Sequence, residues 1–97
     1  MLSTNDILNF LKQEKHYLHK QFDVSDIAVF GSFAKNENVD SSDVDILVEF
    51  DKVSFDKYIK LKMFLENKLS INVDLVRKGP HLSSGFLSSI EKDLIYA

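Results

Sequence analysis

The segment Asp43–Phe50 constrains the fold most, because its side chains alternate between two faces. Four apolar residues share one face: Val44, Ile46, Val48 and Phe50. The other face carries Asp43, Asp45, Leu47 and Glu49. A period of two is that of a β-strand with one face against a core. The segment therefore predicts a sheet strand that opens with two carboxylates on one face.

Helical and strand-like segments take turns along the rest of the chain. Further strands are predicted at Ile27–Phe30, which ends at Gly31-Ser32, and at Ile71–Arg77. Helices are predicted from Ser3 or Thr4 to about Lys20, briefly after Ser32, from Ser54 to Leu69, and over Ser83–Lys92. Leu94–Tyr96 is predicted to dock as a tail or an edge strand. This order predicts an α/β or α+β fold with helices layered on a small sheet.

Length and composition exclude several kinds of protein that this chain could otherwise be. A chain of 97 residues predicts one domain, residues 1–97. Its net charge of −3 argues against broad nucleic-acid binding, which needs a dense basic face. The absence of cysteine excludes disulfides, thiolate zinc sites and cysteine nucleophiles. With no apolar run of about 18 residues and no signal-peptide pattern, no membrane contact and a cytoplasmic location are expected.

Gly31-Ser32 lies at a predicted strand-to-helix turn. Glycine lets the backbone turn sharply and approach a ligand closely. The free N–H groups at the start of the following helix can bind a phosphate, and Ser32 adds a hydroxyl donor. Taken alone, Gly-Ser at such a place is more often a plain turn with a serine cap.

Three carboxylates are candidates for a metal site: Asp43, Asp45 and Asp74. Close carboxylates raise each other's pKa unless a cation lies between them, and their hard oxygen atoms suit magnesium or manganese. A lone Asp-x-Asp is more often a solvated strand end. Asp74, within the apolar strand Val73–Val76, is costly if buried and unpaired, and otherwise faces solvent. Following a phosphate-binding turn, the three together favour the metal site.

Together these segments resemble the signature of the polymerase β-type nucleotidyltransferases. The resemblance is carried by Gly-Ser-Phe-Ala-Lys at 31–35 and Ser-Asp-Val-Asp-Ile-Leu-Val at 42–48. The small size and the strand Val73–Val76 are similar to the minimal branch, called MNT, whose members usually act as antitoxins beside a helical HEPN-type ribonuclease toxin. The resemblance covers most of the chain from Ile27 onward. It implies the polymerase β-like fold, a small mixed sheet with flanking helices.

The resemblance also implies a role for each matching residue. Asp43 and Asp45 would hold Mg²⁺ or Mn²⁺ against the triphosphate of ATP, and Asp74 would complete the site and help to deprotonate the attacking hydroxyl. Gly31 and Ser32 would hold the outer phosphates. Lys35-Asn36 stands where the family often has Arg-Gly, so Lys35 keeps the charge for a phosphate contact without the planar fork. Asn36 tolerates a left-handed backbone, so the loop geometry is expected to be kept.

Two hypotheses follow for the function. The first is an enzyme that transfers AMP from ATP to a hydroxyl, such as a tyrosine of a HEPN-type toxin, and so acts as an antitoxin. The second is a catalytically silent module that neutralises its partner by masking it. Modification of a small molecule such as an aminoglycoside is a third, but such enzymes usually have extra helices for their substrate. The chain is short for gripping an acceptor alone, so a partner is expected, in a homo- or hetero-oligomer.

Other conspicuous residues are interpreted as structural. The three histidines and the lysines of the segment 57–68 are expected to be solvated. Five phenylalanines are predicted to lie in the core rather than to stack on bases: Phe10, Phe22, Phe55, Phe64 and Phe86.

Overall fold

A single mixed sheet organises the chain, for which the computed structural model describes residues 2–97. Its strands are β1 (Val24–Phe30), β2 (Val44–Phe50), β3 (Val73–Arg77) and β4 (Ile95–Tyr96). They lie in the order β3-β2-β1-β4. β1 is antiparallel to both β2 and β4, whereas β2 and β3 are parallel. The predicted fold class, helices on a small mixed sheet, is confirmed, and the C-terminal segment is an edge strand.

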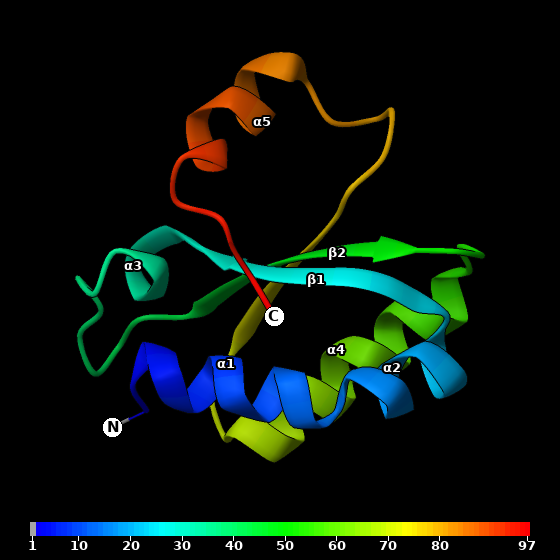
Figure 1. Cartoon of the computed structure of the whole chain (residues 1–97), viewed down its shortest axis with the longest axis horizontal. Coiled ribbons are helices and arrows are strands. Elements are labelled where there is room, and N and C mark those ends of the chain that lie inside the picture. The colour runs from blue at the N-terminus through cyan, green and yellow to red at the C-terminus, as the bar shows by residue number, and fades with distance from the viewer. Residues whose placement is uncertain (1) are drawn as a thin grey trace.

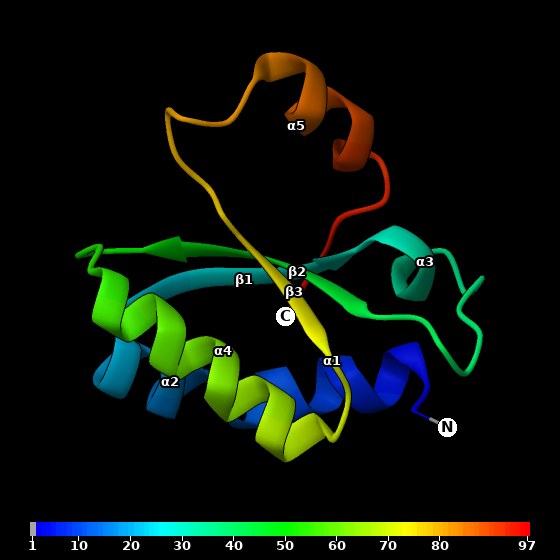
Figure 2. The ribbon, with the colours of Figure 1, turned by 180° about the vertical axis from the view of Figure 1, so that it is seen from behind.

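The helices are distributed unequally over the two faces of the sheet. They are α1 (Thr4–Gln13), α2 (Lys15–Phe22), α3 (Gly31–Ala34), α4 (Phe55–Leu69) and α5 (Ser84–Glu91). Figure 1 shows α1, α2 and α4 below the sheet and α5 alone above it, with α3 at one end. The view from behind in Figure 2 shows the same layers. Among residues 2–97, no helix is both long and apolar enough to cross a membrane.

The larger core lies between the sheet and the three helices below it. The alternation in β2 directs Val44, Ile46 and Val48 into this core, where each is fully buried. The opposite face of the same strand presents Leu47, which packs with Phe30 and with Ile90 of α5 in a smaller cluster. The alternation that the sequence shows therefore separates a large core from a small one and leaves the rest of the upper face for polar residues.

The N-terminal helical segment is interrupted, although the sequence predicted one helix to about Lys20. Ser3 caps α1 in a capping box with Asp6, as a serine at this place predicts. Glu14 ends α1 and also precedes α2. The break lets Leu18 and Phe22 reach the core that Leu11 also enters, as helices that wrap a core commonly bend.

The strand boundaries differ from the predictions in ways that pairing explains. β1 begins at Val24 rather than Ile27, because its early residues pair with the end of β2 across an irregularity between Val24 and Asp26. β2 begins at Val44, so Asp43 lies just before the strand. β3 begins at Val73 rather than Ile71. Ladder pairing with a neighbour, which a single segment does not reveal, sets these ends.

The prediction that Phe55 is a core residue was wrong. Its side chain is 79% exposed, because it is the first residue of α4 and lies outside the buried face of that helix. Phe22 is buried, and Phe10 and Phe64 are half-buried against the larger core. Phe86 packs on Phe30 in the smaller cluster, with the two ring centroids 6.1 Å apart.

Side chains of α4 cover the outer edge of β3, an edge strand of the sheet. The Tyr58 hydroxyl donates to the Leu75 carbonyl, and the Glu66 carboxylate accepts from the Val73 N–H at 2.9 Å. Lys62 donates to the same carboxylate at 2.9 Å. Satisfied edge groups discourage pairing with another chain. The bonds from Tyr58 and Glu66 also fix the position of β3, and therefore of Asp74, along the neighbouring strand β2.

We predict that Glu66→Gln lowers the melting temperature at neutral pH but not in acid. The bonds from Lys62 and then Val73 hold the pKa of Glu66 below the ordinary 4.5, so its stabilising contribution is complete above pH 4.5. That contribution is lost as the pH falls through the lowered pKa, where protonated glutamate resembles glutamine. Thermal unfolding from pH 3 to pH 7 checks this, with the exposed Glu37→Gln as the matched control. A difference that is as large in acid as at neutral pH would contradict it.

Candidate active site

The sheet register brings two of the three predicted carboxylates side by side. Asp45 of β2 pairs with Asp74 of β3, so both side chains project from the upper face. Asp45 is half-buried, whereas Asp74 is exposed. Asp43, also exposed, precedes β2 by one residue and lies close enough to act on Asp45 by its charge. Residues far apart in sequence therefore meet at the start of two parallel strands.

The glycine turn lies directly against one of these carboxylates. Phe30, the last residue of β1, pairs with Asp45, and Gly31 follows it with a φ of 72°. A Cβ atom on Gly31 would lie 2.0 Å from Oδ2 of Asp45. Glycine is therefore required twice, for its left-handed backbone and for the close approach of the carboxylate.

The electrostatics of this cluster resist full ionisation. Burial first, then the charge of Asp74 and a hydrogen bond with it, and last the charge of Asp43 raise the pKa of Asp45 from 3.8 to about 6. A carboxylate in such surroundings is stabilised by a proton or by a cation. The possible metal ligands contributed by Asp43, Asp45 and Asp74 are all carboxylate oxygens, so a hard divalent cation such as Mg²⁺ fits their chemistry.

The carboxylates do not by themselves surround a cation. Within residues 2–97, no group of three or more histidine or acidic side chains is arranged so that it could hold a metal ion. Asp74 is within hydrogen-bonding reach of Asp45, whereas Asp43 acts on Asp45 by its charge alone. A metal at this place would thus take only part of its ligands from the side chains as they lie.

The other predicted binding residues lie on or next to α3. Gly31 and Ser32 open this helix of four residues, and Lys35 caps its end. The Lys35 ammonium lies 3.7 Å from the Asp93 carboxylate, beyond α5. Asn36 has a φ of 58°, which confirms the expectation of a left-handed backbone at this position.

Two residues that hold α3 were missed by the sequence analysis. They are Asp93, the partner of Lys35, and Thr4, whose hydroxyl reaches the Phe33 carbonyl. Both lie far from α3 in sequence, one near each end of the chain. Neither belongs to a periodic pattern or a motif, so no local signal could have found them.

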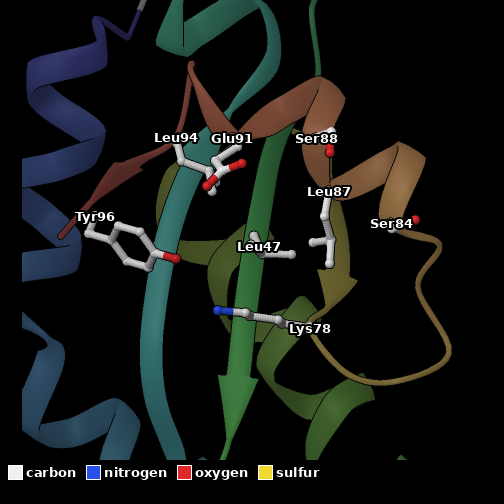
Figure 3. Close-up of a pocket in the computed structure, with 8 residues that line it drawn as sticks. All are labelled: Leu47, Lys78, Ser84, Leu87, Ser88, Glu91, Leu94 and Tyr96. Atoms are coloured by element: carbon white, nitrogen blue, oxygen red, sulfur yellow. The ribbon is translucent and has the colours of Figure 1, made fainter.

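A separate pocket of about 460 Å³ lies under α5 on the same face of the sheet. Leu47 forms its floor, with Tyr96, Lys78 and residues of α5 arranged around it in Figure 3. The pocket starts two residues along β2 from Asp45, yet none of the six predicted site residues lines it. The carboxylates and this pocket are therefore neighbouring but distinct features.

Known proteins share both the sequence pattern and the fold. A family model described as "Polymerase beta, Nucleotidyltransferase" matches residues 12–97. The protein adenylyltransferase MntA of Thermococcus cleftensis is 39% identical over 97 residues, which cover 99% of this chain and 97% of the relative. A solved structure of an inferred minimal nucleotidyltransferase superposes with a TM-score of 0.79 at 25% identity, covering 97% of this chain and 95% of that one.

A solved complex of a tri-AMPylated Shewanella oneidensis HEPN toxin with its MNT antitoxin shares the fold as well. Its TM-score is 0.67 at 19% identity, and the match covers 96% of this chain and 70% of that one. The sequence of this chain thus matches the adenylyltransferase relative, and its fold matches the two solved structures, over almost the whole chain.

We predict that Gly31→Ala destabilises the fold by about 1–2 kcal/mol or more, because a left-handed backbone costs an ordinary residue about that much. The methyl group also displaces the Asp45 carboxylate, which lies where it would be placed. Gly85→Ala is the matched control, since Gly85 lies in α5 with nothing within 4 Å of an added Cβ. It should be neutral or stabilise by about 0.5–1 kcal/mol. Urea unfolding of both variants checks this, and equal stabilities would contradict the close approach.

Proposed function

Since this chain belongs to the polymerase β nucleotidyltransferase family, we propose that it transfers AMP from ATP to a hydroxyl group of a partner protein and thereby acts as an antitoxin. The family assignment follows from the model that matches residues 12–97. The transferred group is proposed because the MntA relative is named a protein adenylyltransferase. The proposed catalytic unit is the whole chain, residues 1–97, as one minimal domain.

The observation that carries the proposal is the convergence of three segments at one end of the sheet. Asp45 lies against the backbone of Gly31 on one side and pairs with Asp74 on the other. A nucleotide phosphate bound at the Gly31-Ser32 turn would therefore lie beside the carboxylates. Positioning of reactants in this way supplies a large part of catalysis in phosphoryl and nucleotidyl transfer.

In this proposal the carboxylates have two roles, metal binding and acceptance of a proton. Asp43, Asp45 and Asp74 would supply part of the ligands of Mg²⁺ or Mn²⁺, and the metal would offset negative charge on the phosphates. Asp74, exposed and in contact with Asp45, accepts the proton of the acceptor hydroxyl. The acceptor oxygen then forms a bond to the α-phosphorus of ATP. The bond to the bridging oxygen breaks, and pyrophosphate leaves.

Gly31, Ser32 and Lys35 are proposed to hold the outer phosphates. The backbone of Gly31 can approach a ligand because no side chain intervenes. Ser32 supplies a hydroxyl and Lys35 a positive charge within the same short helix and its cap. Lys35 must then share its charge between the phosphates and Asp93, from which it lies 3.7 Å.

A protein is the proposed source of the acceptor hydroxyl. Asp43 and Asp74 are exposed, so a side chain presented on the surface of a partner can reach them. The solved complex that shares the fold pairs an MNT antitoxin with a HEPN toxin carrying three AMP groups. We therefore propose a tyrosine of a HEPN-type toxin as the acceptor. AMP would block the toxin by its charge and bulk.

We predict that magnesium binds weakly to the chain alone and more tightly with ATP. The side chains supply only part of a coordination shell, and the phosphates add the missing oxygen atoms. Replacing Asp43 and Asp45 by asparagine should abolish the gain that ATP gives. Titration calorimetry with Mg²⁺, with and without a non-hydrolysable ATP analogue, measures it. If the double variant retains the gain, the carboxylates do not form the metal site.

We also predict a mass increase of one or more AMP units on the HEPN-type toxin that this proposal assigns as the partner. The experiment mixes the two proteins with ATP and magnesium and measures the intact mass of the partner. Asp74→Asn should slow the transfer by about 10²–10⁴, the usual contribution of a general base. Asp43→Asn should abolish it.

The same experiment separates modification from masking. If the chain and Asp43→Asn suppress the partner equally and its mass is unchanged, masking is the function and the enzyme proposal fails for this pair. If Asp74→Asn transfers AMP at the parent rate, Asp74 is a structural residue of β3 and the proposed base is wrong.

A further inference from the structure

Thr4 is a buried polar residue with an unusual contact. Within residues 2–97 it is the one polar residue among the buried ones, with 7% of its surface exposed. It begins α1, but the cap of that helix is Ser3, whose hydroxyl accepts from the Asp6 N–H. The Thr4 hydroxyl is therefore not needed to cap its own helix and is available for another element.

That element is α3 and the turn after it. The Thr4 hydroxyl donates to the Phe33 carbonyl, and its Oγ1 atom lies 3.0 Å from Oδ1 of Asn36. A hydroxyl donates only one hydrogen bond, here to Phe33, so the second contact is satisfied by the opposite orientation of the Asn36 amide, in which its NH₂ group donates to Thr4. Figure 1 shows the start of α1 next to α3, which this pair of contacts joins.

α3 needs such support because it is very short. A helix of four residues has about one turn, which does not persist on its own in water. The chain after it continues through a polar loop, from Lys35 to Asp43, with no regular structure. Contacts with other elements must therefore fix its position.

We propose that Thr4, through Phe33 and Asn36, is a positioning residue for nucleotide binding at the Gly31-Ser32 turn. This inference rests on the proposed function, because it takes the turn to be the phosphate site. Thr4 contacts the second half of α3 and the residue after its cap, while Asp45 lies against the first residue of the helix, where an added Cβ on Gly31 would be only 2.0 Å from its Oδ2 atom. A small shift of α3 would change both the phosphate contacts and the room for Asp45.

The left-handed Asn36 gives a way to separate its backbone from its side chain. Its φ of 58° suits glycine as well as asparagine. Asn36→Gly therefore keeps the loop conformation and removes only the amide that reaches Thr4. Thr4→Val removes the hydroxyl and keeps the shape of the side chain. Thr4→Ser keeps the hydroxyl and removes only the methyl group.

The experiment measures the dissociation constant of a non-hydrolysable ATP analogue with Mg²⁺ by titration calorimetry. We expect roughly three- to tenfold weaker binding for Thr4→Val and Asn36→Gly, the factor that corresponds to one typical hydrogen bond. Thr4→Ser should bind like the parent chain. In amide hydrogen exchange, Thr4→Val should speed exchange over residues 31–36 and leave the amides of β2 unchanged.

Ser3→Ala is the matched control for loss of stability alone. It removes the cap of the same helix, at a cost of about the same size as a hydrogen bond, and leaves the contacts of Thr4 in place. It should bind the analogue like the parent chain. Parent-like binding by Thr4→Val, or equally weak binding by Ser3→Ala, would overturn the inference. If the parent chain itself bound no nucleotide, the proposed function would fail. Unchanged hydrogen exchange over residues 31–36 in Thr4→Val would separately overturn the claim that Thr4 positions α3.

Discussion

The register of β1, β2 and β3 is the constraint on which the rest of the structure depends. Phe30, Asp45 and Asp74 lie side by side across the three strands. Since side chains alternate along a strand, a slip of one residue in β2 would turn Asp45 into the larger core and Val44 out to solvent. Burial of an unpaired carboxylate costs several kcal/mol, so the apolar face of β2 and the position of its acids enforce the same register. Core formation and assembly of the carboxylate pair are thus one event.

The uneven cover of the sheet explains why the acids remain accessible. Three helices close the lower face, where the alternating valines and isoleucines lie. On the upper face α5 packs over Phe30 and Leu47 through its own Ile90 and covers only part of the strands. Asp45 is half-buried beside this cover, and Asp74 lies beyond it in solvent. Asp45 lies against Gly31, and its partial burial is the largest cause of its raised pKa, whereas the exposed Asp74 stays accessible.

Local patterns predicted much of this from the sequence, and long-range pairing accounts for what they missed. The alternation of β2, the serine caps of α1, α4 and α5, and the glycine turn each depend on a few neighbouring residues. The proximity of Asp45 to Asp74 could be expected once both were placed on strands of one sheet. The early start of β1 and the contacts of Thr4 and Asp93 depend on partners distant in sequence. No periodicity or spacing encodes those partners, and the functional roles of the six site residues stay predictions.

The distribution of contacts shows why so small a chain can build this site at all. The middle of the sequence supplies the carboxylates and the strands that align them. Thr4 near the N-terminus contacts Phe33 of the short helix α3, and Asp93 near the C-terminus pairs with Lys35 at the end of the same helix. A one-turn helix has little stability of its own, so these distant contacts help to hold it in place. Loss of either end of the chain would therefore act on the Gly31-Ser32 turn, although neither end contributes a carboxylate to the cluster.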